Sequence, residues 1–589
     1  MLTLTTFFAF VLLAGAVRFH DFVPKGESHF NGVPVEKYGR SMNRLIHLTQ
    51  KLVDMDTVES YLPRFEGMEW NPNATSPDMN PFLYQGDINL TESQLDALVE
   101  DFEVQLAEKE GRPVPERLYS ANINLWSQFP ISWSIDSQRP PDGGLAAVQR
   151  GIVMWEKSTC ITFRQSSDHS SGGMIFFSGS GCSSPIGKAS LNYVSIGPRC
   201  GDPAVVAHEI GHSLGLFHTQ TRPDADKHVN IFWQNIQQGM QYNYKPPSAN
   251  FRATNRGIPY DLGSVMHYGR TGFPIRYDLI TMQPIHRNYD QSMGQRASIA
   301  FTDAKEVNLM YCNHICRQQL PCLHGGYTDP KDCSKCRCPD GLGGTLCESV
   351  APSPSSCGKG ELEASSDYHT LTMNGVGRCN YKITSPQGRK VALVLDWSAF
   401  DGGNFDNACD FNFVELKYSS QLQTAGARFC NYYRTPAVTV PGHQSSNQVY
   451  IIYSSQQSQY GFSLRYRYEP QDSSPPTITP ESIVATDRSE TSQSTTPPGL
   501  VTLTTQNPAN ATHSSTSFAP IQWGPWSGCS LACGGCGRRI RYSINDPNTW
   551  EQSYCNFNPC YHPNYPYPYC CGPFFYDQFY GQCVHESSG

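Results

Sequence analysis

The chain has 589 residues, a formal net charge of −8 at pH 7 and 22 cysteines. This length predicts several domains rather than one. The negative charge argues against nucleic acid as a partner of the whole chain. The cysteines become dense after residue 300, in spacings that are typical of small extracellular domains. The composition therefore favours an oxidising compartment and excludes general nucleic-acid binding.

The amino terminus carries a short apolar run, residues 7–13, followed by Ala14, Gly15 and Ala16. This pattern predicts a signal peptide over residues 1–16, although no basic residue precedes the run. The alternative is a membrane anchor, but a span requires about 20 apolar residues and this run is shorter. We therefore expect a secreted, extracellular protein with no transmembrane segment. Three Asn-x-Thr triplets are candidate glycosylation sites: Asn73, Asn89 and Asn510.

One stretch, residues 202–218, carries the strongest chemical pattern. Asp202 is a good N-cap and Pro203 suits the first helical position, so the stretch predicts a helix. His208 and His212 are four residues apart and would project from the same face of that helix.

Glu209 lies between these two histidines, close enough to reach a water bound to a metal. Gly215 supplies a left-handed residue that would end the helix and let His218 return as a third ligand. Three imidazoles with one open position are typical of a catalytic zinc site. The alternative is a helix that only happens to carry polar histidines, and Gly215 with His218 argues against it. The pattern resembles the metzincin signature.

A second match, Ser264-Val-Met-His-Tyr268, lies downstream and resembles the astacin family of metzincins. The resemblance implies an α+β metzincin-like peptidase domain over residues 118–312 with one zinc ion per chain. Met266 would form the Met-turn beneath the metal, although a methionine there is also an ordinary gap-filler. Glu209 would be the general base, and Tyr268 would stabilise the oxyanion. Adamalysin-type metzincins lack this Met-His-Tyr ending.

One position departs from the family. Astacins usually have a glutamate directly after the third histidine, where it meets the new amino terminus of the matured enzyme. Here that residue is Thr219. The family's account of how maturation locks the active form is therefore in doubt for this chain, although Thr219 is not a zinc ligand.

Residues 17–117 are expected to form a propeptide, with helices over residues 41–54 and 92–109. Tyr84-Gln-Gly-Asp-Ile88 resembles the aspartate switch of astacin propeptides, which implies that Asp87 ligates zinc in the zymogen. The alternative is a Gly-Asp turn with no metal contact. Arg112 and Arg117 are the expected cleavage points.

Within the peptidase domain we expect a helix over residues 144–155 and strands over 160–163 and 174–177. By resemblance, the second strand would be the sheet edge on which an extended substrate pairs. The astacin cysteines imply two disulfides, Cys160–Cys312 and Cys182–Cys200.

Two disulfide-rich or β-rich modules are expected to follow. Residues 313–348 resemble an EGF-like module without the acidic residues that bind calcium. Residues 357–468 resemble a CUB domain, a β-sandwich, with strands expected at 391–395 and 449–453. Asn412 stands where calcium-binding CUB domains carry an aspartate, which argues against calcium. These resemblances imply five disulfides: Cys316–Cys333, Cys322–Cys336, Cys338–Cys347, Cys357–Cys379 and Cys409–Cys430.

The rest of the chain predicts a linker and a small adhesive module. Residues 469–519 are rich in Ser, Thr and Pro and predict an extended stalk. Residues 520–560 resemble a thrombospondin type 1 repeat, and residues 561–589 form a Cys- and aromatic-rich tail. Arg539 and Arg541 would stack on tryptophans, or also hold sulfated glycans. The pairing of the last eight cysteines stays open: Cys529, Cys533, Cys536, Cys555, Cys560, Cys570, Cys571 and Cys583.

Taken together, these features predict a secreted zinc endopeptidase that is made as a zymogen. The order of modules resembles a nematode subgroup of astacins that works on cuticle collagen, at moulting or at hatching, so the expected substrates are extracellular matrix or cuticle proteins. The alternative is a catalytically silent matrix-binding protein that uses its CUB and thrombospondin modules. All zinc ligands and the general base are present, which favours the enzyme.

Overall fold

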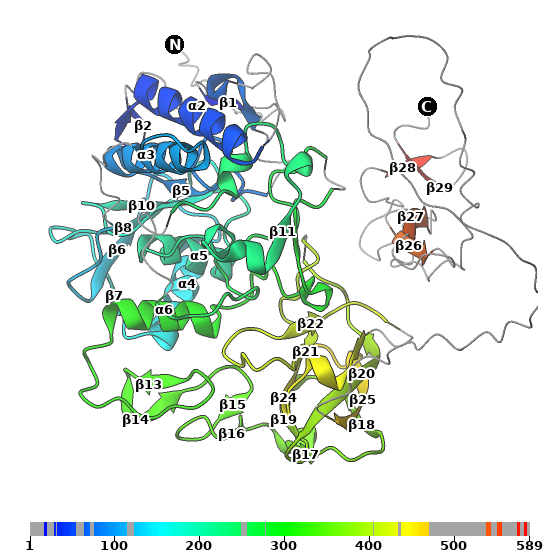
Figure 1. Ribbon diagram of the computed structural model, residues 1–589. Helices are drawn as coiled ribbons and strands as arrows, with labels where there is room; N and C mark the ends of the chain where they lie inside the picture. Colours follow the sequence, from blue (N-terminus) through cyan, green and yellow to red (C-terminus); the bar gives the residue numbers. More distant parts are fainter. Residues whose placement is uncertain are drawn as a thin grey trace, which may run out of the picture. The chain divides into compact units, whose positions relative to one another are not determined.

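The structure is a computed structural model, shown in Figure 1. It describes residues 17–19, 29–30, 32–54, 64–70, 76–114, 123–248, 256–276, 279–404, 406–433 and 438–470, and four strands between 537 and 585. The chain divides into two compact units, residues 1–477 and 478–589. The predicted signal peptide, residues 471–519 of the predicted linker, Arg117, Asn73 and Asn510 lie outside the described residues, and the first two linker residues belong to the last strand of the preceding domain. No helix among the residues described has the length and apolarity that crossing a bilayer requires.

The amino-terminal segment, residues 17–114, is built on two helices that lie side by side (Figure 1), α2 (Val35–Leu52) and α3 (Glu92–Lys109). The helix predicted over residues 92–109 is confirmed, and the other begins six residues earlier than predicted. Thr91 and Gln94 form a capping box at the start of α3, which satisfies two backbone N–H groups. Short strand pairs complete the segment: β1 (Val17–Arg18) with β4 (Glu69–Trp70), and β2 (His29–Phe30) with β3 (Val33–Pro34).

A mixed sheet is the centre of the next part of the chain, with strand order β5-β9-β10-β8-β6-β7. Five strands come from residues 131–196: β6 (Ile131–Ile135), β7 (Phe163–Gln165), β8 (Gly173–Phe177), β9 (Cys182–Pro185) and β10 (Asn192–Ile196). The sixth strand, β5 (Ile88–Asn89), belongs to the amino-terminal segment and pairs with β9 in parallel. The segment therefore closes one edge of this sheet.

This topology corrects one sequence prediction. The strand over residues 174–177 forms as part of β8, but β8 lies between β10 and β6 and is not an edge. The edge strand contributed by residues 131–196 on that side is β9. The edge strand β9 contains two serines and a proline and has no apolar run, so the sequence pattern does not single it out, and only the long-range pairing shows which strand lies at the edge.

Three helices pack with the sheet around one apolar core: α4 (Gly144–Ser158), α5 (Pro203–Ser213) and α6 (Phe301–Tyr311). α4 contains the predicted helix. Gly151 of α4 lies against α5, because a Cβ there would meet Val206 Cγ1 at 2.6 Å. Farther along the chain, β11 (Val229–Ile231) pairs with β12 (Met282–Pro284). The close contact of α4 and α5 fixes the helix that carries two of the candidate ligands.

A small disulfide-rich module follows α6, with two short hairpins: β13 (Tyr327–Asp329) with β14 (Asp332–Arg337), and β15 (Leu342–Gly343) with β16 (Ser349–Val350). A β-sandwich comes next, with sheet orders β17-β19-β24-β21-β22 and β18-β25-β20-β23. Its strands are β17 (Glu361–Glu363), β18 (His369–Asn374), β19 (Gly377–Thr384), β20 (Arg389–Ala399), β21 (Phe413–Lys417), β22 (Ala427–Phe429), β23 (Val438–Val440), β24 (Gln448–Ser455) and β25 (Gly461–Pro470). The two predicted strands, 391–395 and 449–453, lie within β20 and β24.

Seven disulfides join described cysteines, and they are the pairs that the resemblances imply. They are Cys160–Cys312, Cys182–Cys200, Cys316–Cys333, Cys322–Cys336, Cys338–Cys347, Cys357–Cys379 and Cys409–Cys430. In the second unit the described strands form two hairpins, β26 (Gly537–Tyr542) with β27 (Trp550–Cys555) and β28 (Phe574–Asp577) with β29 (Gln582–His585). Arg539 and Arg541 lie in β26, as expected for a strand there.

Candidate metal centre

The helix that carries the first two histidines begins where the sequence predicts. The Asp202 carboxylate accepts a hydrogen bond from the Ala204 N–H at 2.8 Å, and Pro203 is the first residue of α5. This N-cap satisfies a backbone donor that has no partner within the helix. His208 and His212 are both buried on the same side of α5, so their rings lie close together, with centroids 4.7 Å apart.

The turn after α5 brings the third histidine back to the first two. Gly215 has φ +99°, in the left-handed region that glycine tolerates, and the prediction at this position is confirmed. His218 follows and is fully buried. Its Nε2 lies 3.2 Å from the Nε2 of His208, and the His212 Nε2 is also 3.2 Å from that atom. Three imidazole nitrogens therefore converge on one point.

The opposite nitrogen of each ring is held by an oxygen that can only accept a hydrogen bond. His208 Nδ1 donates to the Val265 carbonyl at 2.8 Å, and His212 Nδ1 donates to the Leu216 carbonyl at 2.7 Å. His218 Nδ1 donates to Gln85 Oε1 at 3.1 Å. These bonds fix the Nδ1–H tautomer and leave each Nε2 lone pair directed inward. Burial also lowers the pKa of His208, and lowers that of His218 to about 3, so both rings are neutral.

A tight turn of the amino-terminal segment directs Asp87 toward these histidines. Gln85 and Gly86 have φ of 50° and 81°, and the Ile88 N–H donates to the Tyr84 carbonyl at 2.9 Å. A Cβ on Gly86 would lie 2.4 Å from the Asp78 carbonyl oxygen. Only glycine fits this position without displacing the backbone.

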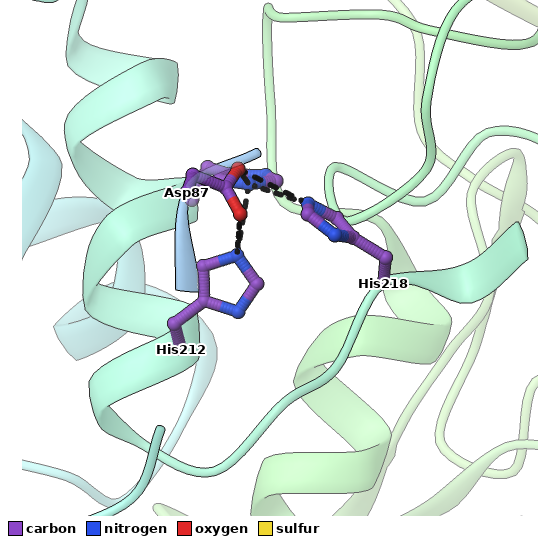
Figure 2. A group of neighbouring side chains, drawn as sticks. Asp87, His212 and His218 are labelled. Atoms are coloured by element: carbon purple, nitrogen blue, oxygen red, sulfur yellow. Dashed lines mark hydrogen bonds and ion pairs between the residues drawn. The ribbon is translucent and has the colours of Figure 1, made fainter. Parts of the chain in front are cut away.

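The carboxylate of Asp87 points toward the rings of His212 and His218 (Figure 2), and His208 belongs to the same group. The Asp87 Oδ2 is 3.1 Å from His208 Nε2 and 3.2 Å from His218 Nε2, and the Asp87 Oδ1 is 3.4 Å from His212 Nε2. The carboxylate therefore stands where the three lone pairs converge. The Gly-Asp turn of the alternative prediction is present, and it brings Asp87 to the histidines.

Glu209 is completely buried beside the ligand group. Neither of its carboxylate oxygens has a hydrogen-bond partner among the described residues. Burial raises the pKa of Glu209 well above its usual range, and the negative charge of Asp87 adds to this effect. A buried carboxyl group without partners is costly, and this one can accept or hold a proton next to the histidines.

Tyr268 forms one wall of the centre. Its ring centroid lies 4.7 Å from that of His218, and its hydroxyl donates a hydrogen bond to the Gln85 carbonyl. Burial raises the pKa of this hydroxyl well above its usual value, so it stays protonated and can donate. In this state the turn that carries Asp87 also engages the Tyr268 hydroxyl.

Comparisons with known proteins decide the family. The sequence profile of the Astacin peptidase family matches residues 119–312. Zinc metalloproteinase nas-34 of Caenorhabditis elegans is 33% identical to the chain over 590 residues, covering 96% of this chain and 92% of that protein. The chain belongs to the astacin family. Zinc metalloproteinase nas-36 of Caenorhabditis briggsae is 34% identical, over 79% of this chain and 71% of its own. A solved structure, High choriolytic enzyme 1, a hatching enzyme zinc-protease from Oryzias latipes, is 28% identical with a TM-score of 0.30, over 33% of this chain and 98% of that one.

As an astacin, the chain is a metalloendopeptidase, and its donor set fits zinc. Three imidazole nitrogens and a carboxylate oxygen lie within 4.8 Å of one another, and all four side chains are buried. The Asp87 Oδ1 atom accepts no hydrogen bond from a described residue, as expected for an oxygen placed to meet a cation. Zinc prefers tetrahedral sets of nitrogen and oxygen ligands of this kind. One zinc ion per chain is accommodated by this group.

The predicted Met-turn packs against the helix that carries His208 and His212. Met266 is buried, and a Cβ added to Gly211 would lie 2.8 Å from its sulfur. Gly211 stands between the two helical ligands and lets the methionine approach the helix backbone. The sequence pattern requires no particular residue at position 211, so this contact could not be found from the motif.

Thr219 takes part in a chain of hydrogen bonds instead of an ion pair. Its hydroxyl donates to Ser264 Oγ at 2.9 Å, and Ser264 donates to Asp303 Oδ1 at 2.6 Å. The second oxygen of Asp303 accepts the Val265 N–H at 2.9 Å. A carboxylate on α6 therefore lies one hydroxyl group away from Thr219. Burial raises the pKa of Asp303 to about 7.

Sequence reasoning also missed Gln85. This residue bonds His218 through its side chain and Tyr268 through its carbonyl, and its amide donates to Thr221 Oγ1 at 3.1 Å. Its position directly before the Gly-Asp pair is the signal that could have drawn attention to it. Through Gln85, the turn that carries Asp87 contacts Tyr268 and Thr221 in addition to the histidines.

Proposed function

We propose that the chain is made as a zymogen in which Asp87 blocks the metal centre, and that removal of the amino-terminal segment produces an active zinc endopeptidase. The observation that carries this proposal is the position of the Asp87 carboxylate among the inward-facing nitrogens of His208, His212 and His218. Asp87 precedes the matched peptidase region, so cleavage between the two separates the inhibitor from the ligands.

Two further contacts support an inhibitory segment that can be removed. Strand β5 covers the edge of β9, where an extended substrate would otherwise pair by its backbone. Arg112, one of the two proposed cleavage points, follows α3 and has 55% of its side chain exposed. The segment therefore blocks both the metal and the sheet edge while one basic residue at its end stays accessible.

The proposed catalytic roles follow from the surroundings of each residue. Zinc bound by the three histidines would supply a Lewis acid that lowers the pKa of a water to about 7 and polarises the scissile carbonyl. Glu209, buried without hydrogen-bond partners among the described residues, would take the proton from the water and pass it to the leaving amine. Tyr268, freed from the Gln85 carbonyl, would donate its hydroxyl hydrogen to the developing oxyanion.

The proposed substrates are extracellular proteins, with collagen-like or cuticle proteins as the first class to test. Seven disulfides among the described residues support a secreted protein, because disulfides persist in oxidising environments. The proposed thrombospondin repeat, with Arg539 and Arg541 in β26, would contact matrix or sulfated glycans. The amide nitrogen of Asn89 donates to Ser183 Oγ at 3.3 Å, which argues against glycosylation of this residue in the uncleaved chain.

The test is the activity of the uncleaved chain. Asp87→Ala opens the centre while leaving the segment attached, so we expect cleavage of a denatured collagen at a rate at least about tenfold above that of the uncleaved wild type. Asp96→Ala is the matched control, because Asp96 belongs to the same segment but pairs with Lys37 at 2.7 Å, away from the ligand group. Because β5 still covers β9 in this variant, equal activity of the wild type and Asp87→Ala would mean that the covered sheet edge, and not this carboxylate, sets the inhibition.

A second variant tests the enzyme itself. In the protein cleaved after Arg117, Glu209→Ala should lose at least about 100-fold in kcat, because the proton acceptor is gone while the three ligands stay. Its zinc content should match that of the wild type. A cleaved wild type that binds zinc but cleaves nothing would favour the silent matrix-binding protein.

A further inference from the structure

The β-sandwich is packed against the peptidase domain through polar groups that are themselves buried. Gln291 and Ser292 have only 5% and 0% of their surface exposed. The Gln291 carbonyl accepts the Cys409 N–H at 2.8 Å. Ser292 Oγ donates to the Gly426 carbonyl at 2.8 Å and accepts the Arg428 N–H at 3.0 Å. Such buried groups would lose their partners if the two parts separated, which costs free energy for each group.

The contact reaches the backbone that directly follows Tyr268. A Cβ on Gly269 would lie 2.0 Å from the Asp406 carboxylate of the β-sandwich. Gly294 has φ +89°, and a Cβ there would lie 2.5 Å from the Gly269 Cα. The Thr271 hydroxyl donates to Asp406 Oδ1. Two glycines thus allow a carboxylate of the sandwich to pack directly on the segment 269–271.

The residue before Tyr268 is held from the same side. The Arg296 guanidinium donates to the His267 carbonyl at 3.1 Å, and the Arg296 backbone N–H donates to Asp410 Oδ1 at 2.8 Å. The Asn404 amide of the sandwich also donates to the Gly294 carbonyl, at 3.1 Å. Both peptide neighbours of Tyr268 are therefore connected to the loop 404–410 of the β-sandwich.

We propose that the β-sandwich is part of the support of the active site, and that Asp406 is a positioning residue that holds Tyr268 through Gly269 and Thr271. An oxyanion donor is effective only when its backbone is fixed, since a misplacement of about 1 Å costs up to about 100-fold in rate. The sandwich thereby takes part in cleavage of a short peptide, in addition to any matrix binding by its outer face. This inference rests on the role proposed for Tyr268.

The experiment is a double-mutant cycle on the full chain after cleavage, with a short fluorogenic peptide as substrate. Asp406→Ala should lower kcat roughly tenfold with little change in KM, because the Tyr268 hydroxyl that it positions acts in the transition state. In the Tyr268→Phe background the same change should have no further effect, since the hydroxyl that it positions is absent. Asp406→Asn should keep most of the activity, because its amide oxygen still accepts the Thr271 hydroxyl.

Asp396→Ala is the control for stability. This change removes a bidentate ion pair within the sandwich, in which Arg465 nitrogens lie 2.7–3.0 Å from the Asp396 oxygens. The contact with the peptidase domain stays intact, so kcat should stay unchanged. Equal losses for Asp406→Ala in both backgrounds, or none in either, would overturn the inference. A Tyr268→Phe variant with full activity would overturn the proposed role of Tyr268, and that result is distinct from a failure of Asp406→Ala alone.

Discussion

At the scale of single residues, the position of the histidine ligands is determined by the side chains that pack against their helix. Gly211 lies between His208 and His212, and Met266 fills the space that a side chain at position 211 would need. Trp155 lies on the same side, 3.3 Å from the position of that absent Cβ. The ligand helix can therefore approach the Met-turn only because residue 211 has no side chain.

Gly211→Ala is expected to lower zinc affinity by about tenfold, because the added methyl group displaces Met266 and tilts the two helical ligands. Competition with a chelator of known affinity measures this change. The double variant Gly211→Ala/Met266→Ala should recover part of the loss, since the opposing sulfur is removed. Unchanged zinc affinity in Gly211→Ala would show that Met266 moves aside without tilting the two helical ligands.

At the scale of elements, the first turn of α6 anchors the Met-turn. Asp303 accepts hydrogen bonds from the Ser264 hydroxyl, the Val265 N–H and the Ala300 N–H, at 2.6, 2.9 and 3.0 Å. Two of these donors belong to the stretch that ends at Tyr268. A change of charge on Asp303 would therefore alter the hydrogen bonds that hold the stretch ending at Tyr268.

The raised pKa of Asp303 predicts a pH dependence of stability. Burial raises this pKa from 3.8 to about 7, so between pH 4 and 7 the folded chain keeps a proton that the unfolded chain has lost. The contribution of Asp303 to stability then falls as the pH rises through this window, by up to about 4 kcal/mol. Unfolding midpoints of the zinc-loaded zymogen and of Asp303→Asn, compared at pH 5 and pH 8, test this. The wild type should lose more stability over this interval than the variant, and parallel curves would contradict the prediction.

Local patterns explain why most of the centre could be predicted from sequence. The spacing of His208, His212 and Gly215 determines one helix face and one turn, and these depend only on neighbouring residues. The edge strand was misplaced because strand order depends on long-range pairing, and the short polar strand β9 has no apolar pattern that would mark it as a strand. The packing of Asp406 on Gly269 has no periodic signature at all, since it joins residues 137 positions apart.

At the scale of the whole molecule, the amino-terminal segment shares a core with the peptidase domain. Phe82 and Leu98 of the segment belong to the same apolar cluster as Tyr242, Tyr244 and Tyr268. Tyr242 also donates to the Pro81 carbonyl at 3.1 Å. The segment that we propose as an inhibitor therefore also stabilises the fold, and its removal would uncover apolar side chains next to the centre.

The cleaved enzyme is accordingly expected to be less stable than the zymogen. Each large apolar side chain that loses its partners gives up about 1.5–3 kcal/mol, and a lowering of the first unfolding transition by about 5–10 °C is the expected result. Calorimetry before and after removal of residues 17–117 measures it, in a Glu209→Ala background that prevents self-digestion and with excess zinc in both samples. The zinc-matched comparison separates the loss of the shared core from the loss of the Asp87 ligand. Equal transition temperatures would mean that the cleaved segment stays bound or that the exposed surface repacks, and gel filtration after cleavage separates these two outcomes.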